Sequence, residues 1–346
     1  MQAVALVSRR LRSGVSVLLA GLGLSVGLGV GLGAAGCGGL ASDAPAMPPG
    51  LAAAPLVSLP RTSAAPARPA GDGAAPTELT LVPEGLGPLD GRAYKVKIPS
   101  GYSAAKATPL VILLHGFSAS GELQELYFNF SALAESRTFL YAYPDGTLNP
   151  LSLRFWNAQE WCCDFFKSGI DDVAYTSAVI DDMSKRYNVD KKRIFVVGHS
   201  NGGFMAHRVA CDLSSRVAAV VSLAGAQQND PTRCLPSELV SVLQVHGTLD
   251  ALIGYGGSTS MYPGARESVA LWATRNGCTG RLTYSGENRD LDAVIPGAET
   301  KVEKYTGCPT GGAVELWSIQ GGSHTPLFTS HWTEGVYDFF MSHPKL

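Results

Sequence analysis

A serine set between glycines, in the stretch Gly198-His199-Ser200-Asn201-Gly202, is the part of this chain best suited to chemistry. When a G-x-S-x-G sequence joins a strand to a helix, its serine is held on a tight bend where only small flanking residues fit. The bend exposes the hydroxyl, and an amide at the start of the helix can stabilise a negatively charged oxygen. Residues 194–197 are typical of a short buried strand, and residues 203–211 have helical spacing. We therefore predict that Ser200 is a nucleophile in acyl transfer.

A serine hydroxyl becomes a good nucleophile only when a base accepts its proton, and the base must itself be oriented by a third group. Five histidines follow Ser200 in the sequence. Among them, His324 follows a strand-like segment and two glycines, a position at the carboxyl edge of a sheet, so we predict that it is the base. Packing within the fold or exposure at the surface explains the others: His207, His246, His331 and His343.

Asp250 is the predicted third member of this catalytic set. It follows the strand-like residues 240–245 and gives the chain order serine, aspartate, histidine that an α/β-hydrolase requires. Its expected role is to hold the imidazole in one tautomer and to stabilise the imidazolium, although a turn cap is the alternative. Asp290 and Asp292 also precede His324, but they lie in a polar stretch typical of a solvated loop.

Two backbone amides are predicted to form the oxyanion hole. One is the amide of Asn201, directly after the nucleophile. The second is expected from His115-Gly116-Phe117, which ends the apolar run of residues 109–114. We predict that Phe117 supplies it, with Ser118 as the second choice. The alternative is that Gly116 only terminates a strand.

Strand-like and helical segments alternate from residue 78 to residue 340, which predicts an α/β fold with a mostly parallel central sheet and helices on both faces. The loop of residues 147–169 is long, and long loops in compact domains are usually functional. Its Trp156 and Trp161 either line the substrate pocket or pack their own loop. The next helix begins with Asp171 and Asp172, which we interpret as caps.

The N-terminus is predicted to be an export signal rather than part of the fold. Residues 1–37 combine arginines with an uncharged apolar stretch that ends in small residues before Cys37, as in bacterial lipoproteins. A lipid on Cys37 would anchor the protein to the membrane of a bacterial-type envelope; the alternatives are a secreted protein and an uncleaved membrane anchor. Residues 38–76 are rich in Ala and Pro and predict a disordered tether, which leaves residues 77–346 for one catalytic domain.

Seven cysteines are compatible with an oxidising compartment, because six remain for disulfides if Cys37 is lipidated. Proximity in the sequence favours two pairs, Cys211 with Cys234 and Cys278 with Cys308. The adjacent Cys162 and Cys163 either bond to each other or stay reduced. No C-x-x-C pair is present and the spacings are irregular, so no metal site is expected. A net charge of −2 gives no reason to expect nucleic acid as a partner, and the predicted chemistry requires no cofactor.

Taken together, LHGF, YPDG, DDVAY, GHSNGG, HGTLD and GGSH resemble the poly(3-hydroxybutyrate) depolymerase and feruloyl esterase family of secreted esterases, also called the LpqC type. The resemblance implies an α/β-hydrolase fold with Ser200, Asp250 and His324 as the triad. It also implies an ester substrate, either a polyester oligomer or a sugar ester. No separate polymer-binding domain is visible, which favours soluble oligomers or sugar-linked esters over solid polymer. We expect hydroxyalkanoate oligomers first, with feruloyl or acetyl-xylan esters as the alternative. A serine peptidase and an inactive binding protein on the same scaffold are less favoured.

Overall fold

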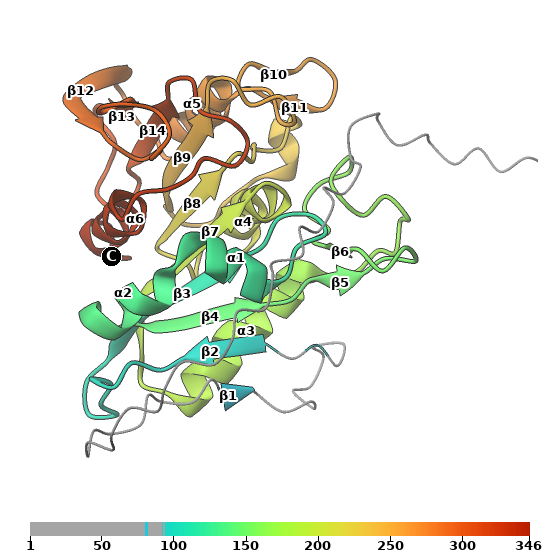
Figure 1. The fold of residues 1–346 in the computed structure, drawn as a ribbon, viewed down its shortest axis with the longest axis vertical. Helices are drawn as coiled ribbons and strands as arrows, with labels where there is room; N and C mark the ends of the chain where they lie inside the picture. Colours follow the sequence, from blue (N-terminus) through green and yellow to red (C-terminus); the bar gives the residue numbers. More distant parts are fainter. Residues whose placement is uncertain (1–79, 82–91, 93) are drawn as a thin grey trace, which may run out of the picture. The chain divides into compact units, whose positions relative to one another are not determined.

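The computed structural model describes residues 80–81, 92 and 94–346, which contain a ten-stranded sheet flanked by helices (Figure 1). The predicted export signal of residues 1–37, with Cys37, and the predicted tether of residues 38–76 lie outside the described residues. Within the described part of the chain, no helix combines the length and apolar character needed to span a bilayer.

Parallel strands form the centre of the sheet. In spatial order they are β4 (Leu140–Pro144), β3 (Thr108–Leu114), β7 (Val189–His199), β8 (Ala219–Leu223), β9 (Ser241–Gly247) and β14 (Val314–Ile319). Antiparallel strands extend both edges: β2 (Tyr94–Lys97) and β1 (Thr80–Leu81) beyond β4, β13 (Thr300–Tyr305) and β12 (Leu282–Arg289) beyond β14. The prediction of a mostly parallel sheet is therefore confirmed.

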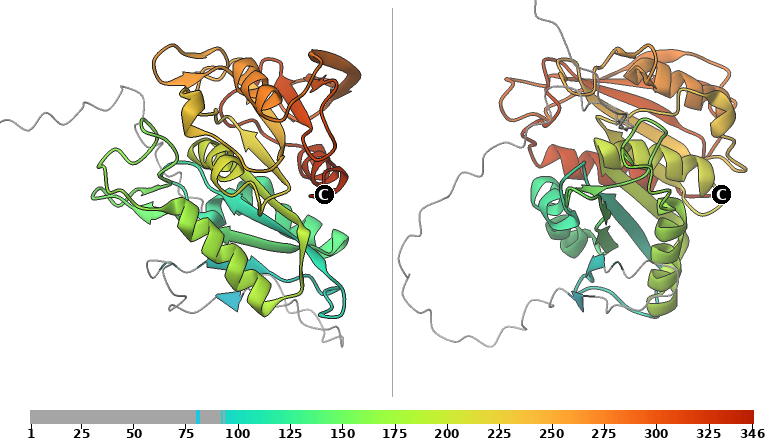
Figure 2. Two further views of the ribbon diagram at one scale, coloured as in Figure 1. Left: turned by 180° about the vertical axis from the view of Figure 1, so that it is seen from behind. Right: turned by 90° about the vertical axis from the view of Figure 1, so that its right-hand side faces the viewer.

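Helices cover both faces of the sheet, because successive strand residues point alternately into two apolar cores. Ile112 of β3 belongs to the core beneath α3 (Asp172–Arg186), α4 (Asn201–Asp212) and α5 (Ala265–Arg275). Leu113, the next residue, belongs to the opposite core with α1 (Gly121–Phe128), α2 (Phe130–Arg137) and α6 (His331–Ser342). Figure 2 shows these two helical layers on either side of the strands.

The structure corrects the sequence prediction for the polar stretch that was expected to be a solvated loop. It contains β12 and β13, whose polar side chains suit strands at the edge of a sheet. Two short ribbons lie elsewhere, in loops that follow β4 and β9: β5 (Thr147–Leu148) with β6 (Arg154–Phe155), and β10 (Gly257–Ser258) with β11 (Tyr262–Pro263).

Candidate active site

Ser200 occupies the bend between β7 and α4. Its φ of 53° and ψ of −120° form a backbone conformation that residues other than glycine rarely adopt. The flanking glycines are needed, since a Cβ on Gly198 would lie 2.0 Å from the Gly202 oxygen, and one on Gly202 would lie 2.0 Å from the Leu114 oxygen. The Ser200 amide donates a 2.8 Å hydrogen bond to Leu223, which ties the bend to β8. The strand, bend and helix predicted around this serine are all present.

Asp250 and His324 are brought together because they follow neighbouring parallel strands, β9 and β14. His324 Nδ1 lies 2.7 Å from Asp250 Oδ2, and the other carboxylate oxygen accepts the amides of Leu252 and Ile253 at 2.9 Å each. The Asp250 side chain is fully buried, whereas 12% of the His324 side chain is exposed. Since a carboxylate only accepts, Nδ1 of His324 carries the proton and its Nε2 is free to act as a base.

Burial by itself would raise the pKa of Asp250, but hydrogen bonds from His246 and His324 oppose this effect. They outweigh it, and the pKa of this carboxyl lies well below its ordinary value. Asp250 is therefore an anion at neutral pH, as its predicted role requires.

The loop that carries His324 is fastened directly to the serine bend. Nε2 of the buried His199, the residue before Ser200, lies 3.0 Å from the His324 carbonyl oxygen. Burial lowers the pKa of His199 to about 3, so its ring is neutral and donates this hydrogen bond. Within the described residues the Ser200 hydroxyl itself makes no hydrogen bond. In enzymes without substrate the contact between nucleophile and base is often long, and it tightens when substrate binds.

The amides predicted for the oxyanion hole lie on the two segments that meet at Ser200. A Cβ placed on Gly116 would be 3.6 Å from the Ser200 Cβ, so the loop of Phe117 packs directly against the nucleophile. Neither Phe117 nor Asn201 uses its amide for a backbone hydrogen bond within the described part of the chain. Ser118 is already engaged, since its amide donates to the Arg154 carbonyl at 2.8 Å. The geometry thus favours Phe117 over Ser118.

His115 holds the Phe117 loop in place rather than taking part in proton transfer. Its Nε2 accepts the Gly146 amide at 2.8 Å, and its Nδ1 lies 2.7 Å from the Gly116 oxygen. Burial lowers the pKa of His115 to about 4, which keeps the ring neutral. Gln124 of α1 accepts the Gly116 amide at 3.0 Å. Each contact fixes the backbone beside Phe117.

Trp156 packs its own loop. Its side chain is fully buried, and its indole N–H donates to the His115 carbonyl at 3.0 Å. The side chain of Asn201 accepts the Trp156 amide at 2.7 Å and donates to the Trp156 carbonyl at 2.9 Å. The packing alternative therefore describes Trp156 better than a place in the substrate pocket. Trp161 is half-buried, with its ring 4.8 Å from those of Phe204 and Tyr262.

All six cysteines in the described residues form disulfides. The predicted pairs Cys211–Cys234 and Cys278–Cys308 are both present, and the adjacent Cys162 and Cys163 are bonded to each other. Since every one of these sulfurs is bonded to another sulfur, they are not available as thiolate metal ligands.

Several residues weighed as alternatives have structural roles. Asp171 caps α3 as predicted, accepting the Ala174 amide at 2.9 Å. Asp172 is buried and pairs with Arg92 at 2.7 Å, a tertiary contact that a cap alone does not explain. Asp292, expected on a solvated loop, is 2% exposed and accepts the amides of Val294 and Leu327. His331 is exposed at the start of α6.

His246 is a further residue of the site that the sequence interpretation did not include. The glycine after it suggested a packing role, but its Nε2 lies 3.2 Å from Asp250 Oδ2, and the residue is 1% exposed. The spacing of the two residues indicates this contact. His246 ends a strand and Asp250 follows four residues later, so a tight turn directly after the strand brings the two side chains together. The Leu249 and Asp250 amides are both held in this turn, by Gly322 and Gly247.

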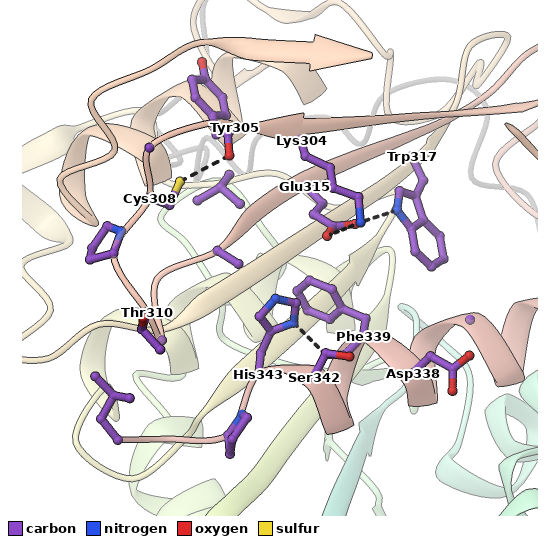
Figure 3. Close-up of a pocket in the computed structure, with 18 of the residues that line it drawn as sticks. Lys304, Tyr305, Cys308, Thr310, Glu315, Trp317, Asp338, Phe339, Ser342 and His343 are labelled. Carbon is purple, nitrogen blue, oxygen red and sulfur yellow. Dashed lines mark hydrogen bonds and ion pairs between the residues drawn. The ribbon is translucent and has the colours of Figure 1, made fainter. Parts of the chain in front are cut away.

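A separate cavity of about 690 Å³ lies between β13, β14 and the C-terminal end of α6 (Figure 3). On its wall, Lys304 pairs with Glu315 at 2.9 Å, and the Trp317 indole N–H donates to the same carboxylate at 3.1 Å. The lining residues Ala313 and Val314 place it near the amino end of β14, whereas His324 follows the carboxyl end.

The strained serine bend, the paired histidine and aspartate, and the two amides at one edge of a parallel sheet define a serine hydrolase of the α/β-hydrolase class. A solved acetyl xylan esterase from Aspergillus awamori has the same fold, with a TM-score of 0.55 at 16% identity over 76% of this chain and 99% of that one. The sequence pattern of the phospholipase/carboxylesterase family matches residues 101–270. Over these residues the chain is similar to the carboxylesterases of that family.

Curated relatives are 25 to 30% identical to this chain over the residues that align. Feruloyl esterase B of Piromyces equi is 30% identical over 67% of this chain and 42% of its own length, so the chain spans less than half of that relative. Feruloyl esterase D of Neurospora crassa is 26% identical over 68% of this chain and 74% of the relative. Poly(3-hydroxyalkanoate) depolymerase C of Paucimonas lemoignei is 26% identical over 66% of this chain and 58% of the relative.

Proposed function

We propose that this chain hydrolyses esters that join a carboxylic acid to a sugar, with a feruloyl group as the acyl part. The observation that carries the proposal is the 2.7 Å contact of His324 with Asp250 beside the strained Ser200, in a chain whose relatives include two named feruloyl esterases. Sequence alone put hydroxyalkanoate oligomers first. The relatives support the sugar-ester alternative better.

The first half of the reaction forms an acyl-enzyme. Nε2 of His324 accepts the Ser200 proton while the serine oxygen bonds to the ester carbonyl carbon. The resulting oxyanion accepts hydrogen bonds from the Phe117 and Asn201 amides. When the intermediate collapses, the bond to the sugar oxygen breaks and His324 returns its proton to that oxygen. Asp250 stays ionised throughout and stabilises the imidazolium.

The second half releases the acid. A water molecule loses a proton to His324 as its oxygen bonds to the acyl carbon, and the same two amides bind the new oxyanion. Collapse breaks the bond to Ser200, whose oxygen recovers the proton from His324. The enzyme is regenerated, and the feruloyl group leaves as the free acid.

Aromatic side chains on the segments that flank Ser200 support an aromatic acyl group. The half-buried Phe117 ring lies 5.5 Å from the exposed Phe165 ring in an edge contact. On the helix that begins after Ser200, the Phe204 ring makes edge contacts with the rings of Trp161 and Tyr262. A planar feruloyl ring can make offset or edge contacts with exposed aromatic rings, which an acetyl group cannot make.

The test compares substrates on one preparation of the protein. A feruloyl arabinose ester, an acetylated xylo-oligosaccharide and a hydroxybutyrate trimer would be assayed side by side, with a peptide amide as a further control. We expect kcat/KM for the feruloyl ester to exceed the others by at least about 10-fold, the discrimination of a well-fitting apolar pocket. Higher kcat/KM for the hydroxybutyrate trimer would overturn the feruloyl assignment in favour of the polyester alternative. Turnover of the peptide alone would reject the esterase proposal.

We also propose that the protein is exported and anchored by a lipid on Cys37, on the basis of the residue pattern before that cysteine. Mass spectrometry of the N-terminal peptide from protein isolated with its membrane fraction tests this. A diacylated or triacylated Cys37 as the first residue is expected. An unmodified N-terminus at any other residue would reject the lipoprotein.

A further inference from the structure

Four buried side chains outside the catalytic set form a line of hydrogen bonds that ends beside Asp250. Trp272 of α5 contacts His207 of α4, His207 contacts Gln244 of β9, and Gln244 contacts His246 two residues further along the same strand. None of the four is more than 1% exposed. We call Trp272, His207, Gln244 and His246 the buried relay.

The direction of each hydrogen bond in the buried relay follows from its first member. A tryptophan indole can only donate, so the Nδ1 of His207, 2.9 Å from Trp272 Nε1, must be an acceptor. The proton of His207 is therefore on Nε2, which donates to Gln244 Oε1 at 2.8 Å. Burial lowers the pKa of His207 to about 4, so this ring is neutral and has one proton to place.

The orientation of the Gln244 amide in turn fixes the tautomer of His246. With its oxygen occupied by His207, its amide group donates to the Gly225 carbonyl at 2.9 Å and faces His246 Nδ1 at 3.2 Å. The Nε2 of His246 must then carry the proton. That N–H donates its hydrogen bond to the Ile253 carbonyl at 2.7 Å, and Asp250 Oδ2 lies 3.2 Å from the same nitrogen as an electrostatic contact.

Asp250 thus accepts three hydrogen bonds and has no exposed side-chain surface. The Leu252 and Ile253 amides donate to Oδ1 and His324 donates to Oδ2, while His246 Nε2 lies 3.2 Å from Oδ2. A carboxylate held in this way cannot rotate about its Cβ–Cγ bond without leaving a buried oxygen unsatisfied, which is costly. Its Oδ2 therefore stays directed at His324 Nδ1.

We propose that His246 is a positioning residue for Asp250, and that the buried relay holds the His246 Nε2–H beside the carboxylate that orients His324, through its hydrogen bond to the Ile253 carbonyl of the same turn. The inference rests on the proposed function, because it takes the Ser200, Asp250 and His324 set as the catalytic machinery. It adds a second histidine that never contacts the substrate. The line of donors also links the packing of α4 and α5 to the geometry of the base.

The first test needs no substitution. In full-length protein labelled with ¹⁵N-histidine, long-range ¹H–¹⁵N spectra distinguish the two tautomers of each neutral ring. We expect His246 and His207 to be Nε2–H tautomers. His115 is the internal control with the opposite tautomer, because its Nε2 accepts the Gly146 amide. A His246 ring protonated on Nδ1 would overturn the proposal.

The second test separates positioning from folding. His246→Leu removes the donor, whereas His246→Gln places an amide N–H near the former Nε2. With a short-chain aryl ester, we expect kcat to fall about 10- to 100-fold in the leucine variant, the effect of losing a polar N–H beside a buried charge. KM should change less than about threefold. The glutamine variant should recover most of the loss, and His331→Leu, at an exposed site, should match the unchanged protein.

A double-mutant comparison tests whether the effect of His246 on kcat requires Asp250. If His246 acts through that carboxylate, His246→Leu should lower kcat much less in an Asp250→Asn background than in the unchanged protein. An equal loss in both backgrounds, or unchanged kcat in the leucine variant, would overturn the proposal. Ser200→Ala is assayed in parallel: persistent ester turnover in that variant would instead reject the proposed function itself.

Discussion

His199 and His324, which lie 125 residues apart in the sequence, are joined by a hydrogen bond from a buried ring to a backbone carbonyl at 3.0 Å. Their rings also lie 5.0 Å apart. The residue next to the nucleophile therefore sets the position of the loop that carries the base. This contact predicts an effect on catalysis for a side chain that takes no part in proton transfer.

Replacing His199 by leucine removes the donor while keeping an apolar residue at a buried site. We expect kcat/KM for an aryl ester to fall about 10-fold, because the His324 carbonyl loses its partner and the loop can shift. Steady-state kinetics measures this, with His343→Leu as a half-buried histidine outside the site. Full activity in His199→Leu would show that the loop is held by other contacts.

Three buried neutral histidines predict a loss of stability in acid. The pKa values of His115, His199 and His207 are lowered to about 4, 3 and 4, mainly by burial, from an unfolded value of about 6.5. Below about pH 6.5 the unfolded chain therefore binds more protons than the native state, and stability falls as pH decreases toward these values. Each histidine contributes up to about 1.4 kcal/mol per pH unit in that window, and above it the contribution is complete and constant.

Denaturant unfolding between about pH 7 and pH 4.5 measures this dependence. In His115→Gln the slope of the unfolding free energy against pH should decrease by about 1.4 kcal/mol per pH unit, which corresponds to one bound proton. This change does not depend on the variant's absolute stability. A slope equal to that of the unchanged protein would contradict a neutral buried His115.

Substituting the two candidate aspartates should give opposite results. In Asp250→Asn the amide can donate toward His324 Nδ1 and favour the wrong tautomer, so we expect kcat to fall about 10⁴-fold, as in other Ser-His-Asp enzymes. Asp290→Asn should leave kcat within about twofold, since the Asp290 carbonyl, not its carboxylate, makes the contacts with Thr329 and His331. A large loss in Asp290→Asn with normal Asp250→Asn kinetics would reverse the assignment.

The Cys211–Cys234 disulfide should affect stability rather than chemistry. It closes a loop with a sequence separation of 23, for which chain entropy predicts a contribution of about 3 kcal/mol. Cys211→Ser/Cys234→Ser should lose about that much unfolding free energy, measured in urea, while its folded fraction keeps normal kcat. Cys278→Ser/Cys308→Ser, with a separation of 30, is the matched pair and should lose a similar amount. A loss of kcat in the folded state would contradict a purely structural role.

The parts of the site that could be predicted from the sequence are those set by backbone topology. Carboxyl ends of parallel strands meet at one edge of a sheet, so residues that follow such strands, Asp250 and His324, could be placed together without a structure. The glycines around Ser200 revealed a bend in the same way, because only small residues fit there.

Contacts that depend on side-chain direction could not be predicted. Nothing in the sequence shows that His199 Nε2 reaches the His324 carbonyl, or that the Trp156 indole turns inward to hold His115. The polar strands β12 and β13 were missed because edge strands lack the continuous apolar pattern that identified β3. For His246 the i, i+4 spacing to Asp250 is visible in the sequence, but the side-chain contact depends on the conformation of the turn after β9.

The central claim is that Ser200 is the nucleophile that forms the acyl-enzyme. Incubation with an aryl organophosphonate, followed by intact and peptide mass spectrometry, tests it most directly. We predict a single adduct on the peptide that contains Ser200, loss of esterase activity in step with labelling, and neither labelling nor ester turnover in Ser200→Ala. An adduct on another residue that abolishes activity, or normal ester turnover in Ser200→Ala, would contradict the account.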